Sequence, residues 1–292
     1  MHWPDCRCIP TFDCMRANDP ALTAPSRHGA YVCIADIENL AGLAVDALTA
    51  HLGLVNEASG AAAPTERTSG ASPLDGAPAP NSVAFLRRIE ARPGTVEDRE
   101  LMAAQVIVHV SAVKPEAVAE MCRSLTKLVG HNQLRIISGA VLPLNYTSNR
   151  MHDFAYAHRV LQRPAADAPN AFLVPLNKTA AWWQKSWLER HTYFLPRYDV
   201  EGRRVADGHA LAAEQGIPHL LRRSYRQFEE PAPAGVYDFV NYFECTDDDI
   251  MHFEATCAAL RDVVRNPEWR YVCEGPTWHG RRVARWADLF DS

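Results

Sequence analysis

The sequence predicts an α+β fold with antiparallel sheets, and three observations support this prediction. Short apolar or alternating segments recur along the chain, as is typical of strands. Between them lie longer segments with apolar residues three or four positions apart, which indicate amphipathic helices. The order of these segments is similar in two successive halves of the chain. With 292 residues, 47% of them hydrophobic, the chain is long enough to form two domains or one large one.

The first half is expected to begin after an irregular arm at residues 1–28. Gly29–Asp36 predicts a strand, and the spacing of the apolar residues in Leu40–Leu52 predicts a helix. Residues 56–81 consist largely of Ala, Gly, Pro, Ser and Thr, which offer little apolar surface to bury. We therefore expect a loosely packed, low-complexity insertion at residues 56–81.

The remainder of the first half continues the same alternation of elements. An ordered segment at Val83–Arg92 is followed by a predicted strand at Gln105–Val110, and a further strand is predicted at Leu134–Leu142. Between these strands, Pro115–Val129 has a helical pattern with proline in its first turn, a position that favours proline.

The second half repeats this arrangement. Its predicted elements are a strand at Ala171–Leu176, helices at Thr179–His191 and Val205–Gln215, strands at His219–Arg226 and Val236–Cys245, a helix at Asp248–Val264 and a last strand at Trp269–Cys273. Two β-α-β-β-α-β halves in one chain indicate tandem ferredoxin-like domains of the dimeric α+β barrel type. The predicted domains are residues 29–145 and 146–292.

Composition and charge exclude several classes of function. The net charge of -5 and the scattered arginines provide no basic stripe for a nucleic acid, so a small-molecule ligand is the better prediction. No 18-residue apolar stretch is present, which argues against a membrane-spanning protein. The N-terminal residues do not resemble a secretory signal, so we expect a cytoplasmic protein with mostly reduced cysteines.

The common catalytic and metal-binding signatures are missing. The chain has no G-x-G-x-x-G, Walker loop, G-x-S-x-G or H-E-x-x-H motif. Cys6, Cys8 and Cys14 do not have the spacing of a common zinc site. His152 and His158 are six positions apart and fall on opposite sides of a helix, so they do not suggest a metal pair.

Four separate motifs remain, and together they carry a resemblance. They are the run Pro143–Ser148, Lys178 followed by two tryptophans, His209 with Arg222 thirteen positions later, and the run Tyr242–Glu244. Taken alone, a helical histidine such as His209 is more often a structural or surface residue. In this order and at these separations, however, the motifs resemble the chlorite dismutase family of heme enzymes.

The resemblance implies a heme b cofactor and assigns the residues that hold it. His209 matches the single protein ligand of the iron, and Arg222 matches the catalytic arginine on the open side of the heme. Tyr225, three residues beyond Arg222, identifies which of two neighbouring arginines corresponds, because Arg223 points to the other face of the strand.

The family pattern also assigns cofactor-binding residues around the heme. Tyr146 matches a tyrosine that contacts the macrocycle or its propionates, and Lys178 matches a lysine that pairs with a propionate. Trp182 matches a tryptophan that lines the site, and Trp183 completes the pair. Core packing is the more common role of such tryptophans and is compatible with lining a heme.

Two features differ from the family pattern or leave a choice open. The segment at residues 191–204 is longer than expected, so the approach to the site or a subunit contact is expected to differ. The family has a glutamate that accepts a hydrogen bond from the proximal imidazole. Glu268 is the preferred match, with Asn266 as the alternative.

The predicted activity is the conversion of chlorite to chloride and dioxygen, with Arg222 holding a hypochlorite fragment. Alternatives are an enzyme of the same fold acting on another small oxidant or a nitrogenous substrate, a coproheme decarboxylase, a non-catalytic heme-binding protein and a ferredoxin-like dimer without a cofactor. The decarboxylase is disfavoured because its tyrosine is replaced here by Trp183 and because Arg222 is present. The resemblance also implies a closed homo-oligomer, with a pentamer favoured.

Overall fold

A closed antiparallel barrel forms the centre of the molecule. The computed structural model describes residues 27–56, 81–130, 134–141, 168–216, 218–227 and 231–291. The barrel strands are β1 (Arg27–Ile34), β3 (Asn81–Arg92), β4 (Val106–Ala112), β5 (Leu134–Val141), β6 (Asn170–Lys178), β9 (Leu221–Arg226), β10 (Phe239–Cys245) and β12 (Thr277–Val283). Their order is β10-β9-β5-β1-β4-β3-β12-β6, and β6 also pairs with β10, which closes the ring.

The two halves of the barrel have the same strand order. In the first half the order is β5-β1-β4-β3, and in the second it is β12-β6-β10-β9, so each half places its fourth, first, third and second strands side by side. Every pairing between these barrel strands is antiparallel. The predicted combination of helices with an antiparallel sheet is confirmed, and the two halves share one barrel.

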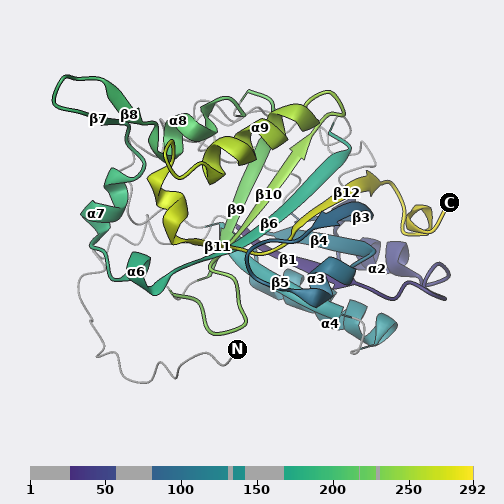
Figure 1. Ribbon diagram of the computed structural model, residues 1–292. Helices are drawn as coiled ribbons and strands as arrows, with labels where there is room; N and C mark the ends of the chain where they lie inside the picture. The colour runs from purple at the N-terminus through teal and green to yellow at the C-terminus, as the bar shows by residue number, and fades with distance from the viewer. Residues whose placement is uncertain are drawn as a thin grey trace, which may run out of the picture.

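Short strands and helices complete the fold. The additional strands are β2 (Val55–Asn56), β7 (Arg197–Tyr198), β8 (Arg204–Ala206) and β11 (Val272–Glu274). The helices are α2 (Val45–His51), α3 (Arg99–Ala103), α4 (Pro115–Val129), α6 (Ala180–Trp183), α7 (Trp187–Thr192), α8 (Gly208–Glu214) and α9 (Ile250–Arg261), with 3-10 helices η5 (Pro267–Tyr271) and η6 (Ala287–Leu289). Figure 1 shows α8 and α9 lying across the second half and α4 against the first half.

Apolar side chains form separate layers inside and outside the barrel. Residues at alternate strand positions point inward or outward, so each strand contributes to two layers. On the outside of the second half, Phe172 and Phe243 pack against Phe253 of α9. The interior contains Tyr31 and Tyr225, both fully buried. The outer layer beneath α9 is therefore distinct from the barrel interior.

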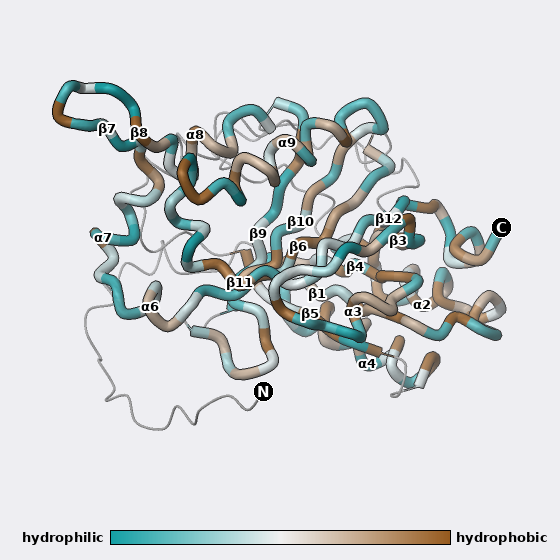
Figure 2. The backbone as a smooth tube through the Cα atoms, viewed as in Figure 1, coloured by the Kyte–Doolittle hydropathy of each residue, from teal (hydrophilic) through white to brown (hydrophobic). Residues whose placement is uncertain are grey.

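The hairpin formed by β7 and β8 falls in the segment that is longer than the family pattern predicts. It extends away from the barrel (Figure 1) and is largely hydrophilic except at its tip (Figure 2). Val200 at the turn is 98% exposed. The additional residues therefore add a projecting hairpin outside the barrel.

Two sequence predictions in the second half are wrong. The single helix predicted at Thr179–His191 is divided into α6 and α7, because the hydroxyl of Ser186 accepts a hydrogen bond from the Glu189 amide and caps a new helix. The last strand predicted at Trp269–Cys273 is mostly the 3-10 helix η5, which begins at a proline. The last barrel strand is β12, which the sequence analysis missed.

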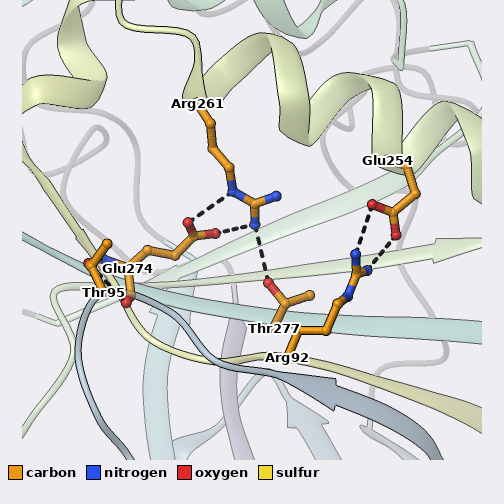
Figure 3. Close-up of polar contacts among 6 residues, drawn as sticks. All are labelled: Arg92, Thr95, Glu254, Arg261, Glu274 and Thr277. Carbon is orange, nitrogen blue, oxygen red and sulfur yellow. Dashed lines mark hydrogen bonds and ion pairs between the residues drawn. The ribbon is translucent and has the colours of Figure 1, made fainter.

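Ion pairs fasten α9 to the rim of the barrel (Figure 3). Arg261 of α9 donates to Glu274 of β11 at 2.9 Å and to the Thr277 hydroxyl at 3.3 Å. Arg92 at the end of β3 donates to Glu254 of α9 at 3.1 Å. Because β3 belongs to the first half of the chain, these contacts hold α9 in place relative to both halves.

Within the described ranges, no helix is both long enough and apolar enough to cross a membrane.

Candidate functional site

The first turn of α8 positions His209 beside η5, which carries Glu268. Gly208 starts this helix with φ of 68°, and a Cβ there would lie 2.4 Å from the Leu195 carbonyl oxygen, so glycine is required. The His209 amide donates to the Tyr193 carbonyl at 2.9 Å. The backbone around His209 is therefore fixed on both sides.

The two ring nitrogens of His209 have different environments. Nδ1 lies 2.8 Å from a carboxylate oxygen of Glu268, and the two side chains are only 12% and 3% exposed. A carboxylate accepts but does not donate, so Nδ1 carries a proton, and in the neutral imidazole Nε2 keeps its lone pair. Nε2 is buried and has no hydrogen-bond partner among the described residues. Phe194 stacks on the ring at 4.9 Å.

Glu268 also binds Lys178, for which the resemblance implies a propionate as partner. The Lys178 ammonium lies 2.5 Å from the other Glu268 oxygen and 4.4 Å from the centre of the Trp182 ring. Its side chain is 5% exposed, so Lys178 and Glu268 form a buried ion pair. Burial alone would raise the pKa of the Glu268 carboxyl, but Lys178 and His209 hold that pKa well below its usual value.

The choice between Glu268 and Asn266 is decided by these contacts. Asn266 is fully buried, and its side-chain amide donates to the Leu260 carbonyl at 2.9 Å. The partner of the His209 imidazole is therefore Glu268, the preferred match in the sequence analysis.

The two tryptophans face different neighbours. Trp182 is fully buried and lies 5.4 Å from the ring of Tyr193, beneath the Lys178 ammonium. Trp183 stacks on Phe239 at 6.2 Å with an angle of 10° between the rings, and the Arg190 guanidinium lies 5.4 Å from it. Trp182 therefore supports the Lys178–Glu268 pair, whereas Trp183 lies against the outer face of β10.

Arg222 and Arg223 point to opposite sides of β9, as strand alternation predicts. The Arg222 guanidinium donates to the Asn241 side chain at 3.0 Å and lies 5.8 Å from the Phe243 ring, which packs beneath α9. Arg223 lies 3.8 Å from Glu244, whose carboxylate is 2% exposed. Arg222 therefore lies in the outer layer, and Arg223 faces the interior.

Other predicted residues fall outside the part of the chain that the structure describes. These are Tyr146, the pair His152 and His158, and the three cysteines near the N-terminus. The assignment of Tyr146 to a heme edge stays a prediction.

Two contacts at the site were missed by the sequence analysis. Phe194 stacks on His209, and Asn241 accepts a hydrogen bond from Arg222. No sequence motif indicates either contact, because the two residues of each pair belong to different parts of the chain. Only strand alternation, which places Asn241 and Phe243 on one face of β10, gave a signal for the second contact.

Comparisons with known proteins identify the fold. No protein-family model matches the sequence, and no curated protein matches it. The structure is similar to that of chlorite dismutase from Candidatus Nitrospira defluvii in complex with imidazole, with a TM-score of 0.56 and 16% identity over 92% of this chain and 95% of that chain. The chain has the chlorite dismutase fold.

Two variant structures of the chlorite dismutase from the same organism give the same result. A variant with an arginine replaced by alanine has a TM-score of 0.56 and 16% identity, over 92% of this chain and 95% of that chain. A variant with a tryptophan replaced by phenylalanine, in complex with cyanide, has a TM-score of 0.55 and 15% identity, over 94% of this chain and 98% of that chain. At this identity the chlorite dismutase similarity establishes the fold, and the chemistry must be argued from the residues of this chain.

Proposed function

We propose that this chain is a heme b oxidoreductase that converts chlorite to chloride and dioxygen. The observation that carries the proposal is the environment of His209. A buried imidazole nitrogen that has a lone pair and no partner is costly in a folded protein. Ligation of a metal ion satisfies this nitrogen, and the carboxylate on the opposite nitrogen is the usual companion of a metal-bound histidine.

The residues around His209 fit a heme. His209 would ligate the iron through Nε2, and Trp183 with Phe239 would supply flat apolar surface beside the macrocycle. Tyr146 is proposed to contact the edge of the macrocycle. When bound, the heme supplies the redox chemistry by which chlorite is split and its two oxygen atoms are joined.

Glu268 and Lys178 tune the proposed ligand. The Glu268 carboxylate accepts the Nδ1 proton in a hydrogen bond, which fixes the orientation of the imidazole and increases its strength as an electron donor. Lys178 keeps this carboxylate anionic and in place. Lys178 is therefore proposed to act on the cofactor through Glu268 and His209 and not through a propionate.

Arg222 is the proposed catalytic residue. Its guanidinium remains cationic at any physiological pH, because the pKa of arginine exceeds about 12, and its planar fork suits an oxyanion. The hydrogen bond to Asn241 orients it in the outer layer of the second half, the layer to which Lys178 also belongs by strand alternation. We propose that Arg222 binds chlorite and then retains the hypochlorite fragment until the oxygen atoms have joined.

The proposal also includes the ferredoxin-like character of the two halves. The strand order within each half supports two ferredoxin-like halves, with the domain boundary near residue 145. The closed homo-oligomer, in which a pentamer is favoured, and the cytoplasmic location stay predictions.

Oxygen release from chlorite tests the activity. Protein reconstituted with heme, with occupancy measured by the Soret band, is expected to release oxygen in proportion to added chlorite. Replacement of Arg222 with alanine is expected to retain the Soret band, lose most of the oxygen yield and bleach the heme sooner. A normal Soret band without oxygen release would support heme binding but exclude chlorite as the substrate. Failure to bind heme would overturn the proposal.

A further inference from the structure

A second group of candidate metal ligands lies apart from the proposed heme ligand. Among the described residues, His219, Asp249 and His252 each offer one ligand atom, and these three atoms lie within 4.8 Å of one another. We propose that this cluster, the His-Asp-His cluster, binds a divalent cation of the zinc class. The inference does not depend on heme binding, because none of these residues belongs to the proposed heme site.

The cluster joins two segments that are distant in the sequence. His219 lies in the turn between α8 and β9, whereas Asp249 and His252 lie at the start of α9. His219 Nδ1 donates to Asp249 at 2.8 Å, and the two imidazole rings stack with their centres 3.5 Å apart and 1° between their planes. The fold therefore already brings the two segments into direct contact through the three side chains.

Only a small rearrangement is needed for all three side chains to bind one ion. Ligand atoms around a tetrahedral zinc ion are about 3.3 Å apart, given metal–ligand distances near 2.0–2.1 Å. The present separations of up to 4.8 Å must therefore shorten by about 1 Å or more. Parallel rings do not direct their lone pairs at one point, so one ring must also turn. The 33% exposure of the His219 side chain leaves room for this rotation.

The chemistry of the cluster selects the class of cation. Two imidazole nitrogens with one carboxylate form a ligand set typical of zinc and related first-row ions, with a remaining position for water. Calcium and magnesium prefer oxygen ligands and are disfavoured. The carboxylate is held by a second contact, because the Thr246 hydroxyl donates to its other oxygen at 2.8 Å.

The local charge also favours a cation. Asp247 and Asp248 precede Asp249 directly, so three consecutive carboxylates lie before the first turn of α9. Asp247 is paired with Arg281 at 2.9 Å, whereas Asp248 is exposed. A bound cation would compensate part of this negative charge.

Binding at this place would act as a clamp. His219 lies three residues before Arg222, and the intervening Leu220 is buried against Phe253 of α9. A cation held from both segments would fix the start of β9 to α9. Because a ligand that binds only the folded state stabilises it, the clamp predicts a higher melting temperature in the presence of zinc.

Zinc binding to the full chain tests the proposal. Purified protein is stripped with a chelator, equilibrated with Zn²⁺ in a metal buffer and measured for zinc per chain by mass spectrometry. The wild type is expected to bind one equivalent. His219→Ala and His252→Ala are each expected to weaken binding at least tenfold, whereas His51→Ala, an exposed helical histidine elsewhere, is expected to leave it unchanged.

Three outcomes would overturn the inference. The first is no zinc above the level of a zinc-free blank. The second is stoichiometric zinc that survives in the His252→Ala variant. The third is zinc that is lost when Cys6 and Cys8 are replaced with serine but retained without His252, which would place the ion on the N-terminal cysteines. Melting curves provide the second readout, because zinc is expected to raise the melting temperature of the wild type but not that of His252→Ala. Iron measured in the same samples reports heme separately.

Discussion

His109 in the barrel interior and His209 in the first turn of α8 both have largely buried side chains, and the comparison shows what distinguishes a candidate metal ligand. Each ring has one nitrogen without a hydrogen-bond partner among the described residues: Nδ1 of His109 and Nε2 of His209. An unpartnered nitrogen therefore does not by itself indicate a ligand. The difference lies in what the other nitrogen contacts.

The surroundings of His109 are aromatic and cationic. Its Nε2 lies 3.1 Å from the Tyr225 hydroxyl, and its ring stacks on Tyr31 at 4.6 Å. Burial lowers the pKa of His109 well below its usual value, and Arg223 lowers it further. Such a ring is a neutral packing element enclosed in the interior.

The surroundings of His209 are anionic and polarised. Glu268 accepts its Nδ1 proton, and Lys178 holds the carboxylate from the other side. The Glu268 carboxylate, which Lys178 holds in place, increases the electron density at the unpartnered Nε2. A buried carboxylate partner, and not burial or a missing hydrogen bond, is therefore the feature that separates the two histidines.

The largest expected effect is on heme binding. His209→Ala is expected to abolish tight heme uptake, whereas His109→Phe is expected to retain it because the ring of the variant can still stack on Tyr31. A heme titration followed at the Soret band measures both. Equal loss of heme binding in the two variants, with both shown to be folded by circular dichroism, would mean that the carboxylate partner does not distinguish the two histidines.

The next effect is on stability. Lys178→Met leaves the Glu268 carboxylate buried without its cation, and removal of one partner from a buried ion pair costs about 3–5 kcal/mol. The free energy of unfolding from urea titration measures this cost. The double variant Lys178→Met with Glu268→Gln is expected to recover part of the loss, because no unpaired charge remains. A double variant less stable than the single one would contradict the assignment of the ion pair.

Arg222 and Arg223 provide a matched test on one strand. Arg222→Gln is expected to lower kcat/KM for chlorite by about 10²–10³, the usual cost of losing one stabilising donor at an oxyanion. Arg223→Gln faces the interior and is expected to reduce stability with little change in kcat/KM. The reverse result would exchange the roles of the two residues.

The pH dependence of stability tests the interior histidine. The lowered pKa means that the unfolded chain takes up a proton near pH 6.5 that the folded protein does not, so folding stability is lost as the pH falls below 6.5. The loss approaches about 1.4 kcal/mol for each pH unit. The charged groups that act on His109 are Arg27, Arg223, Glu244 and Arg282. Urea titrations between pH 5 and 7 are expected to show a flatter profile in His109→Phe, and an unchanged profile would contradict this origin.

The smallest effect is expected at the rim of the barrel. Glu254→Gln breaks the pair with Arg92 (Figure 3), in which both side chains are 40% exposed. Exposed ion pairs contribute about 0.2–1 kcal/mol, and salt screens them. Urea titration at low and high salt is expected to show a difference that shrinks as salt increases. A loss of unfolding free energy as large as that of Lys178→Met would mean that rim and buried ion pairs contribute equally to stability.

Strand and helix patterns were predictable where the signal is local. The helix Pro115–Val129 has the predicted bounds, because its apolar spacing and its proline at the start both lie within the segment. The η5 segment was mistaken for a strand, because Trp269 and Tyr271 favour strands while Pro267 starts a helical turn. Propensity alone could not decide between these competing local preferences.

The sequence by itself determined the repeated order of elements, the alternation that separates Arg222 from Arg223, and the candidates His209 and Glu268. Tertiary structure alone decided that the sheet closes, that Lys178 binds Glu268, and that His209 has one nitrogen held and one left open. The physical reason is the sequence distance over which each kind of interaction acts. Periodicity and capping act within a few residues, whereas Glu268 is 59 residues from His209 and 90 from Lys178, so only the packed chain brings their charges together.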